Sequence, residues 1–175
     1  MKVNDKEFEL YIPEGEIAQV VERLAGEVSR DCRNGDLLVC PVLTGAFLFA
    51  ADLVRRLTVP CEVSFVKYTS YSGMSSTGTV TARLPFPPEV EGRDVLIVED
   101  VVDSGLSMGH MLKELQRLHP RSIRVCTLLF KPGAFKGDYR VDYVGREIGD
   151  EFIVGYGMDY DEKGRELKDI YVVKH

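Results

Sequence analysis

The chain has 175 residues, of which 45% are hydrophobic and 29% charged, and its formal net charge is −6. This length supports one well-packed core, so we expect a single domain over residues 1–175. The negative net charge argues against a protein that coats nucleic acid or an anionic membrane. Since the sequence shows neither a signal peptide nor the roughly 18 uninterrupted apolar residues of a membrane span, we expect a cytoplasmic protein.

The cysteines show no spacing that is typical of a metal or redox site. Cys32, Cys40, Cys61 and Cys126 form no CxxC pair, and the last three lie in apolar runs that read as strands. We therefore expect buried free thiols.

The first half of the chain alternates between helical and strand patterns. Apolar residues at helical spacing predict a helix over 16–31, and Asn34-Gly35 ends it before the strand-like run DLLVCPVL. A second helix is predicted over GAFLFAADLVRRL, followed by the β-rich run CEVSFVKY. The next stretch, from Thr69 to Thr81, is dominated by Ser, Thr and Gly, so we expect a loop there that orders when substrates bind.

The second half continues the alternation. The strand pattern DVLIVE leads into an amphipathic helix, and SIRVCTLLF forms the next predicted strand. Continuous apolar strands that alternate with helices predict an α/β fold with a mostly parallel sheet covered on both faces. In such sheets ligands bind at the carboxyl ends of the strands.

The segment VLIVEDVVDSGLSM, residues 95–108, places three acids at one of those ends. Glu99, Asp100 and Asp103 follow an apolar run, where an ionised carboxylate costs free energy unless a cation or hydroxyl meets it. After them, DSGLS supplies two hydroxyls and the free N–H groups of a new helix, which suit a phosphate. Adjacent carboxylates can accept hydrogen bonds from a vicinal diol or hold a hydrated Mg²⁺ ion. The segment therefore predicts a sugar phosphate as ligand.

This segment admits two other interpretations. Asp103 and Ser104 could simply cap the following helix, and for Ser104 taken alone capping is the favoured interpretation, but it does not explain two acids inside the apolar run. A nucleoside triphosphatase would need a G-x-x-x-x-G-K-[ST] loop, which the chain does not contain.

The order of hydrophobic, acidic and hydroxyl residues in 95–108 resembles the phosphoribosyl-pyrophosphate signature of the type I phosphoribosyltransferases. Three more segments resemble the hypoxanthine-guanine branch of that family: VLTGAFLFAADLVRRL its pyrophosphate loop, KYTSYSG its mobile loop, and LLFKPG with residues 141–173 its purine-binding tail. The resemblance runs from about residue 37 to the C-terminus. It implies a mostly parallel twisted sheet flanked by helices, with a small C-terminal purine-binding hood and a mobile loop.

The resemblance also implies an activity. A purine salvage enzyme of this branch transfers the 5-phosphoribosyl group from phosphoribosyl pyrophosphate to hypoxanthine or guanine, with Mg²⁺ as cofactor, and works as a homodimer or homotetramer. Transfer to xanthine or another base, and a non-catalytic sensor of the phosphoribosyl ligand, remain open as alternatives. Neither nucleic acid nor a membrane is expected as a partner.

Roles for individual residues follow from the same resemblance. Asp103 is the expected general base for the purine imidazole-ring proton, and Lys131, at a strand end, the expected donor to a 6-oxo group. Phe152 is expected to stack on the base, Asp159 to help hold metal, and Arg165 to contact pyrophosphate. The full expected substrate-binding set is Thr44, Gly45, Ser70, Tyr71, Glu99, Asp100, Ser104, Gly105, Leu106, Ser107, Lys131, Phe152, Ile153, Asp159 and Arg165, and the expected metal ligands are Glu99, Asp100 and Asp159.

Three positions depart from the pattern of that branch. Thr44 stands where many members carry Lys or Arg, Arg146 where an aromatic is usual, and Gly149 where proline is usual. The first removes a cation from the pyrophosphate loop, and the other two are expected to alter the geometry near the purine.

Overall fold

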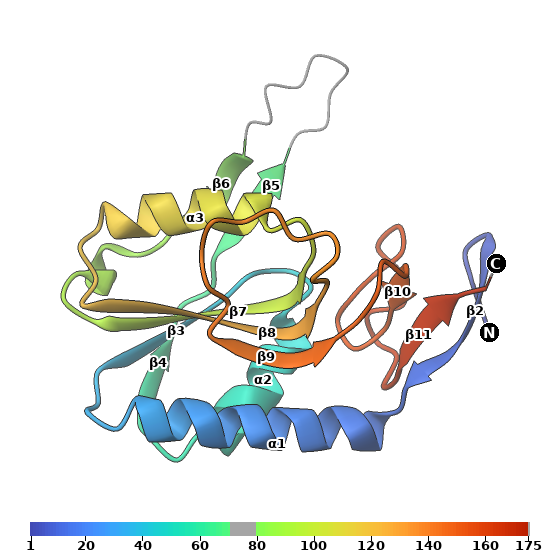
Figure 1. Ribbon diagram of the computed structural model, residues 1–175, viewed down its shortest axis with the longest axis horizontal. Coiled ribbons are helices and arrows are strands. Elements are labelled where there is room, and N and C mark those ends of the chain that lie inside the picture. The colour runs from blue at the N-terminus through green and yellow to red at the C-terminus, as the bar shows by residue number, and fades with distance from the viewer. Residues whose placement is uncertain (71–79, 175) are drawn as a thin grey trace.

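The computed structural model describes residues 1–70 and 80–174. In that part of the chain, the centre is a five-stranded parallel sheet with the order β4-β3-β7-β8-β9. Its strands are β3 (Leu37–Pro41), β4 (Cys61–Val63), β7 (Asp94–Val102), β8 (Ser122–Phe130) and β9 (Tyr143–Glu147). Helices α1 (Glu14–Asp31) and α2 (Phe47–Arg56) lie on one face, and α3 (Leu106–Gln116) lies on the other (Figure 1). This arrangement confirms the predicted α/β fold.

The continuous apolar strands contribute side chains to two hydrophobic cores, one on each face of the sheet. In β3 every residue is buried; Leu37 and Val39 pack with α1 and α2, whereas Leu38 and Cys40 pack with α3. Because successive side chains of a strand point to opposite faces, a strand covered on both sides must be apolar at every position. The cysteines fit this explanation: Cys32, Cys40 and Cys126 are buried free thiols and Cys61 is half-buried. Burial raises the pKa of the Cys40 thiol to about 12.

A second sheet forms the hood beside the central one. It has the order β1-β2-β11-β10 and is antiparallel, with β1 (Lys2–Val3), β2 (Lys6–Ile12), β10 (Ile153–Val154) and β11 (Ile170–Val173). Its own small core contains Val3, Phe8 and Val154. Both chain ends therefore meet in the hood (Figure 1), whereas the sequence led us to expect it from the C-terminal segment alone.

The apolar run CEVSFVKY divides between two sheets. Its first residues form β4, and its last begin β5 (Lys67–Ser70), which pairs antiparallel with β6 (Val80–Leu84) at the top of Figure 1. A short 3-10 helix, η1 (Pro88–Val90), then leads into β7. Most of the predicted loop falls between β5 and β6, and Tyr71 lies outside the described residues. Among those that are described, no helix is both long enough and apolar enough to cross a membrane.

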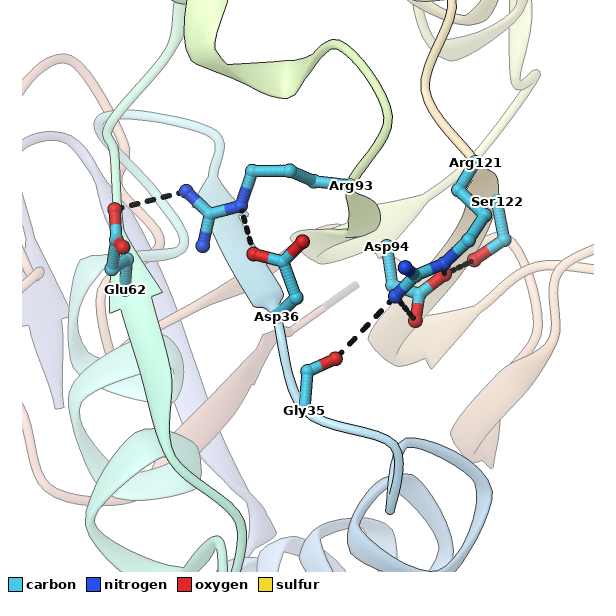
Figure 2. Close-up of polar contacts among 7 residues, drawn as sticks. All are labelled: Gly35, Asp36, Glu62, Arg93, Asp94, Arg121 and Ser122. Carbon is cyan, nitrogen blue, oxygen red and sulfur yellow. Dashed lines mark hydrogen bonds and ion pairs between the residues drawn. The ribbon is translucent and has the colours of Figure 1, made fainter.

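Ion pairs join the amino ends of the parallel strands, opposite the end where ligands are expected (Figure 2). The Arg93 guanidinium lies 2.7 Å from the Asp36 carboxylate, before β3, and 2.9 Å from that of Glu62 in β4. Arg121 donates hydrogen bonds of 3.1 and 2.7 Å to the carboxylate of Asp94, the first residue of β7. These contacts hold β3, β4, β7 and β8 together at their amino ends.

Replacement of Asp94 by asparagine is expected to lower the melting temperature at neutral pH. The hydrogen bond from Arg121, and then that from the Ser122 hydroxyl, hold the pKa of Asp94 below its ordinary value. A carboxyl with a lowered pKa stabilises the fold above its unfolded-state pKa of about 4, and this contribution disappears as the pH falls through the folded-state value. Thermal melts from pH 7 downward should therefore show the difference between variant and wild type shrinking in acid. The exposed Asp138, changed to asparagine, is the matched control, and a difference that is constant with pH would contradict this account.

Candidate active site

A cavity of about 430 Å³ opens where the carboxyl ends of the strands face the hood. It is lined by the loop between β3 and α2, the end of β7 with Asp103 just after it, Lys131 after β8, and hood residues between Phe152 and Arg165. The structure gathers most of the predicted site there: Thr44, Gly45, Glu99, Asp100, Asp103, Lys131, Phe152, Ile153, Asp159 and Arg165. Sequence reasoning missed Val42, Leu43, Val101 and Met158, whose apolar character marked them only as core residues.

A smaller cavity of about 150 Å³ adjoins the first and shares Glu99 and Asp103 with it. Ser104, Gly105 and Ser107 line this second cavity, as the predicted phosphate cradle requires. Leu106 lines neither cavity as the described residues define them, and its side chain is exposed. Ser70 is exposed at the end of β5 and lines neither cavity either, so its substrate contact, like that of Tyr71, stays a prediction.

The acid pair sits within β7, because the strand runs on to Val102, whereas the sequence pattern DVLIVE predicted a strand that ends at Glu99. The pairing of β7 with β8 is interrupted at Asp100. There, the Asp100 N–H donates to the Glu99 carboxylate at 3.1 Å and the Val101 N–H donates to the Asp100 carboxylate at 2.7 Å. The register with β8 is the same before and after Asp100, so no residue is inserted in the strand. Both acids line one cavity, at the strand's carboxyl end.

The electrostatics of this pair favour a cation. Burial, and then the adjacent Asp100 charge, raise the pKa of Glu99 well above its usual value. A divalent cation beside the two carboxylates would offset that repulsion, so the residues fit Mg²⁺. Within residues 1–70 and 80–174, no three acidic, histidine or cysteine side chains form a ready-made metal cluster. The predicted metal ligands Glu99, Asp100 and Asp159 thus line one cavity without forming such a cluster. Mg²⁺ often takes only one or two carboxylates and completes its shell with water and substrate phosphates.

Gly45 lies directly against the acid pair. A Cβ atom at this position would fall on the Asp100 carboxylate, so no larger residue fits without moving that acid. Thr44 is exposed and lines the cavity just before it, and the Leu43-Thr44 peptide bond is cis. The sequence departure at Thr44 therefore does lie at the site.

Lys131 and Asp103 form an ion pair inside the cavity. The Lys131 ammonium lies 3.0 Å from the Asp103 carboxylate, and Lys131 is only 9% exposed. The Lys131 N–H donates to the Val102 carbonyl at 3.0 Å, which fixes the start of the turn after β8 against the end of β7. A lysine at the end of a strand is usually solvated, but Lys131 is buried and its side chain lines the cavity.

The loop before α3 leaves the helix start open to an anion. Gly105, the residue before α3, has φ of 75° and offers no capping side chain, while the Ser104 hydroxyl accepts a long hydrogen bond of 3.4 Å from the Leu106 N–H. A Cβ on Gly105 would also meet Phe135 and Tyr139 at 2.6 Å. Ser104 therefore makes one long contact of the kind that a cap makes, as the capping interpretation expects, whereas Asp103 pairs with Lys131. Because Gly105 stands in place of a capping side chain, the helix start can still receive an anion.

The hood supplies an aromatic and charged wall. The Phe152 side chain is 41% exposed and packs edge-on against Tyr160, with 5.6 Å between ring centroids. Asp159 lies 2.9 Å from the Arg165 guanidinium, which also donates to the Gly157 carbonyl at 2.9 Å. Arg165 is thus held at the cavity rather than free on the surface.

The two remaining departures lie away from the cavity lining. Arg146 pairs with Glu16 in α1, and its guanidinium lies over the Tyr11 ring, 5.8 Å from the centroid. Gly149 is near the Glu151 carboxylate, 2.8 Å from where a Cβ would stand. In β9 the Arg146 side chain points toward α1, and the expectation that Arg146 and Gly149 alter the geometry near the purine stays a prediction.

Comparison with known proteins agrees with this geometry. The phosphoribosyl transferase domain matches residues 12–161. A hypoxanthine-guanine phosphoribosyltransferase of Mycobacterium avium is 49% identical over 133 residues, which are 75% of this chain and 66% of that relative. A hypoxanthine phosphoribosyltransferase of Salmonella typhimurium is 40% identical over 162 residues, 91% of each chain. The crystal structure of a hypoxanthine-guanine phosphoribosyltransferase from Bacillus anthracis superimposes with a TM-score of 0.91 at 36% identity, covering 97% of this chain and 100% of that one. The chain therefore belongs to the phosphoribosyl transferase family, in the branch of the hypoxanthine and hypoxanthine-guanine phosphoribosyltransferases.

Proposed function

We propose that this enzyme transfers the 5-phosphoribosyl group from phosphoribosyl pyrophosphate to hypoxanthine or guanine, releasing pyrophosphate and giving IMP or GMP for purine salvage. The observation that carries the proposal is the meeting of two pairs in one cavity. The acid pair Glu99 and Asp100 faces the same space as the ion pair of Lys131 and Asp103. The first suits a sugar diol, and the second suits an oxo group next to an acidic N–H.

The phosphoribosyl end would be bound by the two cavities together. The 5-phosphate fits the smaller one, where Ser104, Ser107 and the N–H groups at the start of α3, from Leu106 on, can donate to it. Glu99 and Asp100 would hold Mg²⁺, with Asp159 helping from the hood side of the cavity, and the ion when bound supplies positive charge to the pyrophosphate. Arg165 and the N–H groups at Thr44 and Gly45 add donors for the same leaving group.

The base end would be bound between the strand ends and the hood. Lys131 can donate to a 6-oxo group but has no acceptor for the 6-amino group of adenine. Phe152 offers an exposed ring face for stacking, beside Ile153 and Asp159. This donor pattern favours hypoxanthine and guanine over adenine.

The chemistry then depends on charge that develops as the glycosidic bond to pyrophosphate breaks. Positive charge builds at the anomeric carbon, and negative charge on the departing pyrophosphate is met by Arg165 and the loop amides. Asp103 accepts the proton of the purine imidazole ring, and the Lys131 ammonium on the oxo group makes that proton easier to lose. We further propose that residues 1–175 form one domain, that the protein is cytoplasmic, and that it assembles as a homodimer or homotetramer.

The direct test is a spectrophotometric assay with Mg²⁺ and phosphoribosyl pyrophosphate, in which hypoxanthine, guanine, xanthine and adenine are supplied in parallel. Product from hypoxanthine or guanine and none from adenine is the expected result. Product from xanthine alone would show that the enzyme transfers the phosphoribosyl group to a base other than hypoxanthine or guanine. No product from any base, with phosphoribosyl pyrophosphate still bound, would identify a sensor.

A further inference from the structure

The hairpin of β1 and β2 packs against the back of the aromatic wall. The Lys6 ammonium lies 5.2 Å from the centroid of Phe152 and 5.0 Å from that of Tyr160. Both distances fall within the roughly 6 Å at which a cation is attracted to an aromatic ring. One lysine thus contacts both rings of the wall.

The same hairpin holds Tyr160 through its polar atoms. The Tyr160 hydroxyl donates to the Asp5 carboxylate at 2.6 Å, and the Asn4 side-chain amide donates to the Tyr160 carbonyl at 2.9 Å. Because Tyr160 packs edge-on against Phe152, its orientation limits where the Phe152 ring can lie.

An apolar contact completes the arrangement. Phe8 is fully buried, and its ring centroid is 6.3 Å from those of both Phe152 and Tyr160. The two rings are therefore contacted by a cation, a carboxylate and a third ring, all from residues 5–8. This segment precedes residue 12, where the match to the family domain begins.

We propose that Asp5 and Lys6 are positioning residues for the purine, acting through Tyr160 and Phe152. The inference rests on the proposed function, in which Phe152 stacks on the base. A ring that is 41% exposed would lose conformational freedom on stacking unless its neighbours already hold it. The hairpin contacts hold it before the purine arrives, so they favour purine binding without touching the reacting atoms.

The first test is Lys6→Met, which removes the charge and keeps an unbranched apolar side chain. The KM for hypoxanthine is expected to rise about threefold, the size of an exposed cation–π contact, with kcat and the KM for phosphoribosyl pyrophosphate unchanged. Lys2→Met, in the same hairpin but exposed, is the matched control and should leave all three constants unchanged. A purely structural role would lower the melting temperature without separating the two KM values, and that result would overturn the proposal.

The second test is a double-mutant cycle with Asp5→Ala and Tyr160→Phe. Each change removes one partner of the same hydrogen bond, so each should raise the KM for hypoxanthine, and the double variant should show no further rise. Independent effects that multiply would show that Asp5 does not act through Tyr160.

A binding measurement separates this inference from the proposed function. Calorimetric titration with IMP should show about threefold weaker affinity for Lys6→Met than for wild type. A wild type that binds IMP but forms no product would refute the proposed activity, and this comparison would still test the positioning role. Equal affinity in variant and wild type, or no binding of IMP by the wild type, would overturn the inference.

Discussion

Replacement of Asp103 by asparagine is expected to lower turnover about 10²-fold or more, the usual contribution of a positioned general base. Asparagine has nearly the same shape, and its amide oxygen can still accept from the Lys131 ammonium, which lies 3.0 Å from the carboxylate in the wild type. What the amide loses is the ability to take a proton from the purine. Affinity for phosphoribosyl pyrophosphate should stay nearly unchanged, so kcat and a direct binding titration together check the assignment.

The control for this variant is Asp150→Asn, which changes an exposed acid that does not line either cavity. It should behave as wild type. Turnover at the wild-type rate in Asp103→Asn would remove Asp103 as the base. A loss of phosphoribosyl binding as large as the loss of turnover would instead make Asp103 a sugar-binding residue.

The sequence predicted the features whose cause is local. In β7, an apolar run followed by two acids and DSG shows both a buried strand and polar groups at its carboxyl end, because each signal lies within a few neighbouring residues. Parallel order follows, since strands that alternate with helices are joined by crossovers. The cavity position of Glu99, Asp100 and Asp103 was predictable for this reason.

Features that depend on contacts between distant segments were not predictable. The N-terminal half of the hood forms because β2 pairs with β11, where Phe8 stands opposite Val173. A pattern of alternating apolar residues marks a strand but does not say which strand it joins. The positions of Asn4, Asp5 and Lys6 beside the aromatic wall follow from this pairing, so no local pattern indicated them.

Side-chain direction was not predictable at Arg146. The resemblance marked this position as a departure near the purine, and only the structure shows its side chain against Glu16 and Tyr11. The same limit applied to Lys131 and Asp103. Both were assigned to the site from the sequence, yet their direct pairing became visible only when the turn after β8 was seen packed against the end of β7.

Replacement of Lys131 by methionine is expected to lower kcat/KM for hypoxanthine about 10²-fold, because a charged hydrogen bond to the 6-oxo group is lost. Methionine fills similar space with an unbranched chain, so the packing of this buried position should survive. The ratio of activity on hypoxanthine to activity on adenine should fall as well, since the wild-type ammonium meets an oxo group but finds no acceptor on an amine. Parallel assays with the two bases measure both effects, with Lys136→Met, which changes an exposed lysine a few residues beyond that turn, as control.

Combining the two replacements tests whether Asp103 and Lys131 act together in the same catalytic step. If Lys131 makes the purine proton easier to lose and Asp103 accepts that proton, then Lys131 should contribute less to turnover once Asp103 can no longer accept it. The double variant Asp103→Asn with Lys131→Met should therefore lose less than the product of the two single losses. Losses that multiply would mean that the two side chains act on separate steps, despite the 3.0 Å between their charged atoms. Lys131 would then contribute to purine binding alone, and the oxo group would be recognised without being used to acidify the ring.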